Sequence, residues 1–455
     1  MSSVHAAPPP PAPLPRRARF VVPPFDRNGW LVITGKIART FGFGMLSIGI
    51  GLHLAAIGLD AATTGIILGF SLLGTMMLTL MIAVFGDRVG RRRFLFIGSA
   101  LMIGAVFMPL AAGAPILMAL ICATGAVSAT ASESSGLISA DQAILPQTVP
   151  VERRTDAFAF YSLMAYVSSA VGSAAIAPLV GIAVLLGATS EQEYIGVFLA
   201  YGAAGAVSAL ASLGLNRAAE VAPENRIKGF GIVKSRRTVA QITGLFSWDA
   251  FATGLILNGF LAYWFKTAHG LGAGEIAAVY AITSIISAFS FPIAARLSIR
   301  FGLIWTMVFT NLPANLMLIG LALVPPGPVG TPIVVGLFLM RSFLAAMDQP
   351  IRQSYVMGVV DPSERTATAG VTSLVRSGAQ TAGPFIAGTL LLPLGVAVPL
   401  AVSGILKVGY NAMLWRTFKD RPAPEEVARK EATRARIAAA LAAKASLAGE
   451  KPPEG

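Results

Sequence analysis

Residues 64–112 read TGIILGFSLLGTMMLTLMIAVFGDRVGRRRFLFIGSALMIGAVFMPLAA. Two apolar runs, 64–85 and 94–112, are joined by Gly86-Asp87-Arg88-Val89-Gly90-Arg91-Arg92-Arg93. A helix of about 20 apolar residues is long enough to cross the hydrocarbon core of a bilayer. The stretch therefore predicts two transmembrane helices that are connected by a short, strongly basic loop.

The same pattern extends over most of the chain. Of its 455 residues, 55% are hydrophobic and 13% are charged, about half the charged share of an ordinary soluble domain. So few charges cannot cover a soluble protein of this length, which excludes that class. We predict an all-α membrane protein with twelve transmembrane helices, at 41–59, 64–85, 94–112, 115–140, 158–186, 194–215, 242–265, 276–295, 303–324, 332–347, 367–392 and 396–418.

Lysine and arginine residues set the orientation, because cytoplasmic loops carry an excess of them. With the N-terminus inside the cell, 29 of the 35 lie in cytoplasmic segments and only Lys266 lies in an external one. We therefore predict a multi-pass protein of the inner (plasma) membrane with both termini in the cytoplasm. Contact with anionic lipid accounts for the net charge of +13, so a nucleic-acid partner is not required.

The two halves of the chain match at a constant offset of 212 residues. The matching loop residues are Gly58, Leu59 and Ala61 with Gly270, Leu271 and Ala273; Arg88 and Gly90 with Arg300 and Gly302; and Pro150, Glu152 and Arg153 with Pro362, Glu364 and Arg365. Such a duplication predicts two pseudo-symmetric six-helix bundles with a substrate site between them near the midplane. The predicted units are a disordered proline-rich leader (1–29), an N-terminal bundle (30–215), a basic linker (216–240), a C-terminal bundle (241–418) and a charged, alanine-rich tail (419–455).

The loop at 86–93 resembles the cytoplasmic signature of the major facilitator superfamily. The resemblance implies a gating motif made of Gly86, Asp87, Arg88, Gly90 and Arg91, in which Asp87 faces the N-terminus of the eleventh helix. A carboxylate is favoured at that position by the helix dipole. Gly86 allows close helix approach, and Gly90 allows a tight turn. In the alternative interpretation the arginines only anchor the topology.

Glycine and proline residues give a weaker resemblance to the proton-coupled drug antiporters of this superfamily. The fifth helix contains Pro178 and Gly181, and the eleventh contains Gly383 and Pro384. Ala177 replaces the glycine that begins the fifth-helix motif of those antiporters. Small residues and proline are also ordinary packing and kink devices in membrane helices, so this second interpretation stays open.

Charged residues inside the predicted spans are the strongest functional candidates, because charge is expensive in a bilayer and usually pairs or lines a cavity. Asp249, Asp348 and Glu133 are candidates for proton coupling, in that order. Arg39, Arg341, Arg376 and Lys407 are candidates for binding an anionic part of a substrate. The alternative is that these groups form structural ion pairs.

These features predict a secondary active transporter of a small organic solute that works by alternating access. The chain has no G-x-x-x-x-G-K-[ST] nucleotide loop, so we expect proton-coupled transport, with efflux as the leading direction. Proton-coupled uptake of an anionic metabolite and a non-transporting receptor or scaffold are the alternatives. No enzyme motif is present, and one cysteine and three histidines make a metal site improbable. We expect no cofactor and a monomer in the bilayer.

The topology can be tested with single cysteines on a Cys122→Ala background. Positions 269 and 191 should react with an impermeant thiol reagent in intact cells, whereas positions 226 and 422 should react only after lysis. The reason is the asymmetric placement of basic residues, which are retained on the cytoplasmic side. Labelling of position 226 from outside would contradict the predicted orientation.

Overall fold

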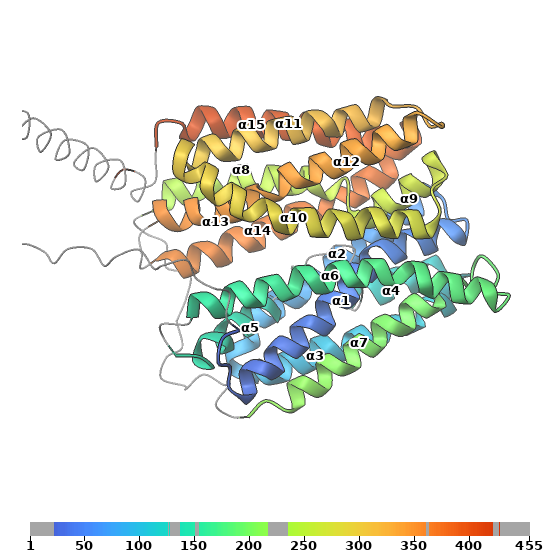
Figure 1. Cartoon of the computed structure of the whole chain (residues 1–455), viewed down its shortest axis with the longest axis horizontal. Coiled ribbons are helices and arrows are strands. Elements are labelled where there is room, and N and C mark those ends of the chain that lie inside the picture. Colours follow the sequence, from blue (N-terminus) through green and yellow to red (C-terminus); the bar gives the residue numbers. More distant parts are fainter. Residues whose placement is uncertain are drawn as a thin grey trace, which may run out of the picture.

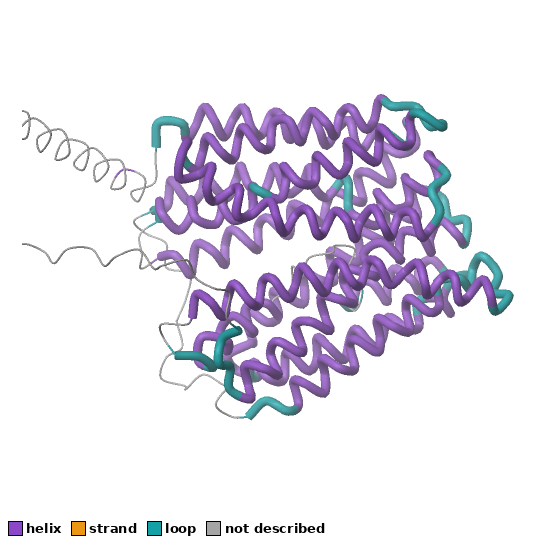
Figure 2. The backbone as a smooth tube through the Cα atoms, viewed as in Figure 1, coloured by secondary structure: helices purple, strands orange, loops and turns teal. Residues whose placement is uncertain are grey.

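The computed structural model describes residues 22–125, 127, 137–150, 154–216, 235–360, 364–421 and 427. Within these ranges the chain forms helices and connecting segments, and no strand (Figure 1 and Figure 2). The helices of the first half are α1 (Arg27–Ala56), α2 (Ala61–Val89), α3 (Arg91–Gly104), α4 (Pro115–Ala123), α5 (Leu137–Ile144), α6 (Arg154–Leu185) and α7 (Ile195–Leu213). Those of the second half are α8 (Arg236–Gly254), α9 (Asn258–His269), α10 (Ala273–Phe301), α11 (Leu303–Leu323), α12 (Gly330–Ala346), α13 (Asp348–Val359), α14 (Arg365–Ile386) and α15 (Val398–Phe418).

The helices form two bundles, one from each half of the sequence. In the first bundle α1 packs against α6 and α7, and α3 packs against α7. In the second bundle α8 packs against α14, and α11 packs against α15. The bundles meet through α1 with α9, α2 with α14, and α6 with α10. The predicted all-α fold of two six-helix bundles is confirmed.

Several predicted spans are not single α-helices: 94–112 passes from α3 into two 3-10 turns, and 367–392 passes from α14 into a π-helical segment. Two other spans are interrupted. The span predicted at 242–265 consists of α8 and α9, which are separated at Leu255–Leu257. Gly254 ends α8 where its backbone lies directly against the backbone of Gly383 in α14. The span predicted at 115–140 is also wrong as a continuous helix: α4 ends at Ala123, and Gly125 has a left-handed φ of +79°, a conformation that commonly ends a helix.

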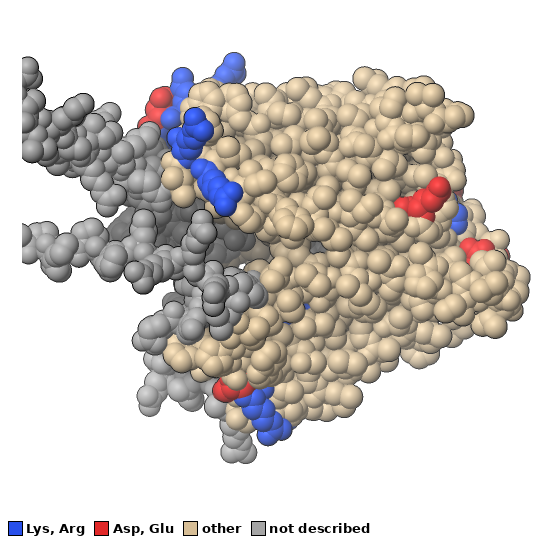
Figure 3. All heavy atoms as spheres, viewed as in Figure 1, with Lys and Arg blue, Asp and Glu red and all other residues tan. Residues whose placement is uncertain are grey.

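The outer surface of the bundles suits a lipid environment. In the described residues, eight helical segments are long and apolar enough to cross a membrane. Large apolar side chains such as Leu110, Ile116 and Leu185 are at least 80% exposed. Figure 3 shows an uncharged belt between two ends, with most of the drawn lysine and arginine side chains at the end where α8 begins and α15 ends. A belt of this kind separates two polar faces, as in a membrane-spanning protein.

Small residues bring the two bundles together toward the end where α1 ends and α2 begins, here called the outer end. A side chain at Gly51 would collide with the backbone of Gly259 in the other bundle, and one at Gly65 would collide with Gly388. Lys266 Nζ also donates to the Tyr194 hydroxyl across the bundles, at 3.1 Å. Toward the opposite end, where α8 begins and α15 ends, the bundles diverge (Figure 1).

The close contact at the outer end predicts that Gly51→Ala destabilises the protein. The new methyl group has no room beside Gly259, and overpacking of this kind costs about 1–3 kcal/mol. Thermal unfolding in detergent, followed by labelling of the buried Cys122, should show a lower midpoint for the variant. Gly181→Ala is the matched control, because a Cβ there would meet nothing within 4 Å. Equal midpoints for the two variants would contradict the close contact.

Candidate functional site

Asp249 of α8 is the centre of a charged cluster in the C-terminal bundle. Lys407 Nζ of α15 donates to Asp249 Oδ1 at 2.6 Å, and Arg352 Nη1 of α13 donates to Oδ2 at 3.2 Å. The same Arg352 nitrogen lies 3.4 Å from Asp348 Oδ2. The two aspartates therefore tie three helices together through two basic side chains.

The cluster lies deep in the bundle. At 1.5 Å per residue, Asp249 is about 20 Å from the start of α8, and Lys407 is about 14 Å from the start of α15 at the opposite end. The side chains of Asp249 and Arg352 are each 13% exposed. Charges this deeply buried are stabilised only when partners and further hydrogen bonds replace water.

The cluster continues to the interruption between α8 and α9. Lys407 Nζ also donates to Thr253 Oγ1 at 2.7 Å, one residue before the end of α8 at Gly254. Beyond the interruption, the Tyr280 hydroxyl of α10 donates to the carbonyl oxygen of Asn258 at 3.0 Å. Interrupted helices near the midplane form substrate and ion sites in many transporters. The position of this one beside a charged cluster makes it a candidate site.

Two further arginines lie near the cluster without joining its ion pairs. Arg341 of α12 is within electrostatic range of Tyr280 and Asp249, and Arg376 of α14 is within range of Asp249, Asp348 and Arg352. Neither makes a hydrogen bond or an ion pair with the residues that the structure describes. Both are partly exposed.

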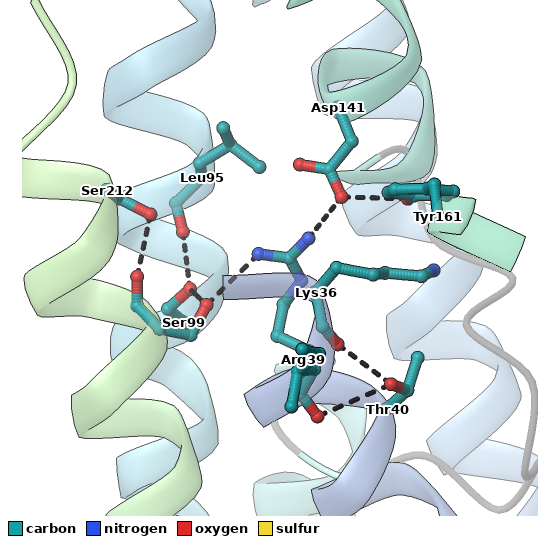
Figure 4. A network of polar contacts seen from close by, with 10 residues as sticks. Lys36, Arg39, Thr40, Leu95, Ser99, Asp141, Tyr161 and Ser212 are labelled. Carbon is teal, nitrogen blue, oxygen red and sulfur yellow. Dashed lines mark hydrogen bonds and ion pairs between the residues drawn. The ribbon is translucent and has the colours of Figure 1, made fainter. Parts of the chain in front are cut away.

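The N-terminal bundle has a separate polar network (Figure 4). Arg39 of α1 forms an ion pair with Asp141 of α5 and donates to the Ser208 hydroxyl of α7 at 3.0 Å. The Tyr161 hydroxyl of α6 donates to Asp141 Oδ2 at 2.9 Å, and Lys36 Nζ lies 4.8 Å from the centroid of the same ring. The Arg39 and Asp141 side chains are 1% and 0% exposed. This pair joins four helices and is closed to solvent.

The charged residues that the sequence singled out and the structure describes therefore belong to two separate sites, the C-terminal cluster and the N-terminal network. Asp249, Asp348 and Lys407 lie in the C-terminal cluster, with Arg341 and Arg376 beside it. Arg39 does not belong to that group, because its guanidinium is consumed by the buried pair of the other bundle. Glu133 lies outside the described residues.

Two members of these clusters were not among the sequence-based candidates: Asp141, and Arg352, which the sequence alone could equally place at the membrane interface. A signal was available: Asp141-Gln142 and Asp348-Gln349 occur at the cytoplasmic ends of the fourth and tenth spans. Arg352 follows Asp348 by one helical turn, a spacing that places the two side chains on one face. The offset of 212 residues hides the correspondence, because the two dipeptides match at a different spacing.

The structure describes the backbone of the predicted gating loop but only some of its side chains. Gly90 has a φ of +103° before α3, as expected for a tight turn, and Gly302 at the equivalent loop has +95°. The side chains of Asp87, Arg88 and Arg91, and the surroundings of Gly86, lie outside the described residues. Their gating role remains a prediction.

The four packing and kink candidates have different environments. Gly383 packs directly on α8, and Pro384 lies two residues before α14 changes to a π-helical segment (Ala387–Leu391). Pro178 lies inside α6, which continues to Leu185. Gly181 has no neighbour within 4 Å of the Cβ position, so no close helix contact requires a glycine there.

Comparison with known proteins gives the family. The sequence pattern of the Major Facilitator Superfamily matches residues 32–384 and 256–449. The chain belongs to this superfamily. It is thus a membrane transporter of a solute and not an enzyme.

Individual relatives are distant. An uncharacterized membrane protein of Saccharomyces cerevisiae, YJR124C, is 23% identical over 404 residues, which cover 80% of this chain and 88% of the yeast protein. The crystal structure of the nucleoside transporter NupG has a TM-score of 0.65 at 15% identity, covering 87% of this chain and 98% of its own. A bacterial homolog of the human lysosomal transporter Spinster, inward-facing and occupied, has a TM-score of 0.64 at 19% identity, covering 88% and 99%. These similarities extend to the fold.

Breaking the sealed ion pair and removing an unpaired arginine should affect stability differently. Asp141→Asn should lower the thermal unfolding midpoint strongly, because removing one partner of a buried ion pair costs about 3–5 kcal/mol. Arg341→Gln should leave the midpoint unchanged or raise it, because no ion pair of that side chain is broken. Differential scanning fluorimetry in the same detergent would compare the two. A larger loss for Arg341→Gln would contradict this division.

Proposed function

We propose that the chain is a proton-coupled secondary transporter of a small organic solute, and that the C-terminal cluster contains its solute and proton sites. The observation that supports this most is the position of Asp249: deep in the bundle, with 13% of its side chain exposed, and close to an interrupted helix. Major facilitator transporters move solutes, whereas the coupling ion and direction differ between members. The alternative of a silent receptor or scaffold predicts no exchange of any solute.

Asp249 is suited to coupling because its two partners are on different helices. Lys407 belongs to α15 and Arg352 to α13. A carboxylate that keeps both partners stays ionised, whereas one that loses a partner in a water-poor site gains a proton more readily. Relative movement of α13 or α15, or a solute that competes for one base, would therefore link proton uptake to transport. Asp348 is the second candidate, because Arg352 also contacts it and its other oxygen has no hydrogen-bond partner.

The arrangement of the bundles is consistent with alternating access. Contact between the bundles is tight at the outer end and the bundles diverge at the other. If the termini are cytoplasmic, as the basic residues predict, this is a state open to the cytoplasm. Rocking of the bundles would then open the contacts at Gly51 and Gly65. Efflux remains our proposed direction, on the weaker basis of the antiporter-like glycine and proline residues.

The experiment starts with a thermal-shift screen of metabolites and drugs, followed by counterflow of the stabilising compound in proteoliposomes. Asp249→Asn should abolish accumulation driven by a proton gradient but retain counterflow, because exchange requires no net proton movement. Binding of the compound to wild-type protein in weak buffer should change the bulk pH, and binding to the variant should not.

Asp420→Asn is the matched control, since it makes the same change at an exposed position beyond α15. Normal accumulation and normal pH dependence in Asp249→Asn would exclude Asp249 as the coupling acid. If wild-type protein shows no counterflow of the stabilising compound, the cluster is not a transport site for that compound.

A further inference from the structure

Arg341 and Arg376 are two cations of the C-terminal bundle that form no ion pair with any residue the structure describes. The Nε atom of each is buried and makes no hydrogen bond, and neither residue forms an ion pair within the described ranges. A buried donor without an acceptor is destabilising, and more so when it is charged. Guanidinium groups stay protonated under all ordinary conditions, so these two cannot be relieved by losing a proton.

The two aspartates of the cluster do not supply a negative charge for Arg341 and Arg376, because both are paired with other bases. Asp249 is bound by Lys407 and Arg352, and Asp348 is bound by Arg352. Among the described residues of the cluster, the four bases Arg341, Arg352, Arg376 and Lys407 face two acids. The formal excess is two positive charges in the middle of a membrane protein, where uncompensated charge is costly.

The two arginines both lie well inside their helices and near the same carboxylate, Asp249. Arg341 is about 17 Å from the start of α12 at the outer end, and Arg376 is about 17 Å from the start of α14 at the other end. Both are within electrostatic range of Asp249. Arg341 is also near Tyr280, whose hydroxyl is bound to Asn258 at the helix interruption. A solute bound between the interruption and Asp249 would thus have Arg341 on the side of Tyr280 and Arg376 on the side of Asp348 and Arg352.

We propose that Arg341 and Arg376 bind a solute that carries two negative charges, as a dicarboxylate or a phosphate monoester does. Planar guanidinium groups bind both carboxylate and phosphate through paired N–H donors. Two such charges neutralise the excess of the cluster without displacing Asp249 from Lys407. The inference rests on the proposed transport function and adds the chemical class of the solute. The anion belongs either to a soluble metabolite or to a lipid headgroup.

The test measures binding to full-length protein in detergent, by isothermal titration calorimetry and thermal shift. The probes are succinate and glycerol 3-phosphate, with lysophosphatidic acid as a lipid that carries the same phosphate monoester. Succinamide and glycerol are the uncharged comparators. Arg341→Gln and Arg376→Gln are compared with wild type, and Arg416→Gln, an exposed position on α15, is the charge-matched control.

At least one dianion should bind wild type and the Arg416→Gln control equally, and should bind each cluster variant roughly 30-fold or more weakly, as expected when one partner of a buried charge pair is removed. Binding of lysophosphatidic acid alone, with the same loss in the variants, would support the arginine site and assign the anion to a lipid. Equal dianion binding by the variants and wild type would overturn the proposal.

A second outcome separates this proposal from the transport function. If an uncharged or cationic solute undergoes counterflow and no dianion binds, the transporter stands and the anion site is wrong. If neither binding nor counterflow is found for any compound of the wider screen, both proposals fail. Retention of the wild-type unfolding midpoint by Arg341→Gln and Arg376→Gln shows that any lost binding is not a folding defect.

Discussion

The cost of placing charge inside a membrane is the constraint on which this structure depends. Each bundle meets it by pairing across helices: Arg39 with Asp141 in the first, and Asp249 with Lys407 and Arg352 in the second. Such pairs add little net stability compared with apolar packing, but breaking one leaves an uncompensated charge. They therefore fix which helices lie together, while apolar side chains supply most of the contact with lipid.

Each bundle contains one of the two networks, and the networks are chemically inverted. In the first bundle the base is on the opening helix, α1, and the acid is on α5; in the second the acid is on the opening helix, α8, and the base Arg352 is on α13. The first pair is sealed, with almost no exposed area, whereas the second retains some exposure and has two extra arginines nearby. Within one fold, a few charged residues therefore make one network that is sealed and one that carries an excess of positive charge.

The sequence was sufficient for the fold because lipid solvation imposes a strong pattern. Long apolar runs, basic loops and the repeated loop residues together predicted the helices and the two bundles. The interruption at Leu255–Leu257 could not be predicted, since those residues are as apolar as a continuous span requires; it depends on Gly254 meeting Gly383 from a distant helix. For the same reason charge identified Asp249 and Lys407 as important, but only packing showed that Arg39 is separate and that Arg352 completes the cluster.

The interruption between α8 and α9 also connects the site to the outer contact between the bundles. Asn258 and Gly259 are consecutive: the carbonyl of Asn258 accepts the Tyr280 hydroxyl near Arg341, and the backbone of Gly259 lies against Gly51 of the other bundle. Because α9 begins at this point, a short movement of its first turn changes both contacts together. On the other side of the interruption Lys407 holds Thr253 and Asp249, so α8 is anchored in the charged cluster, whereas the first turn of α9 is anchored in the contact between the bundles. The interruption thus places Tyr280, and the surroundings of Arg341, one residue away from the backbone that packs on Gly51 at the outer end.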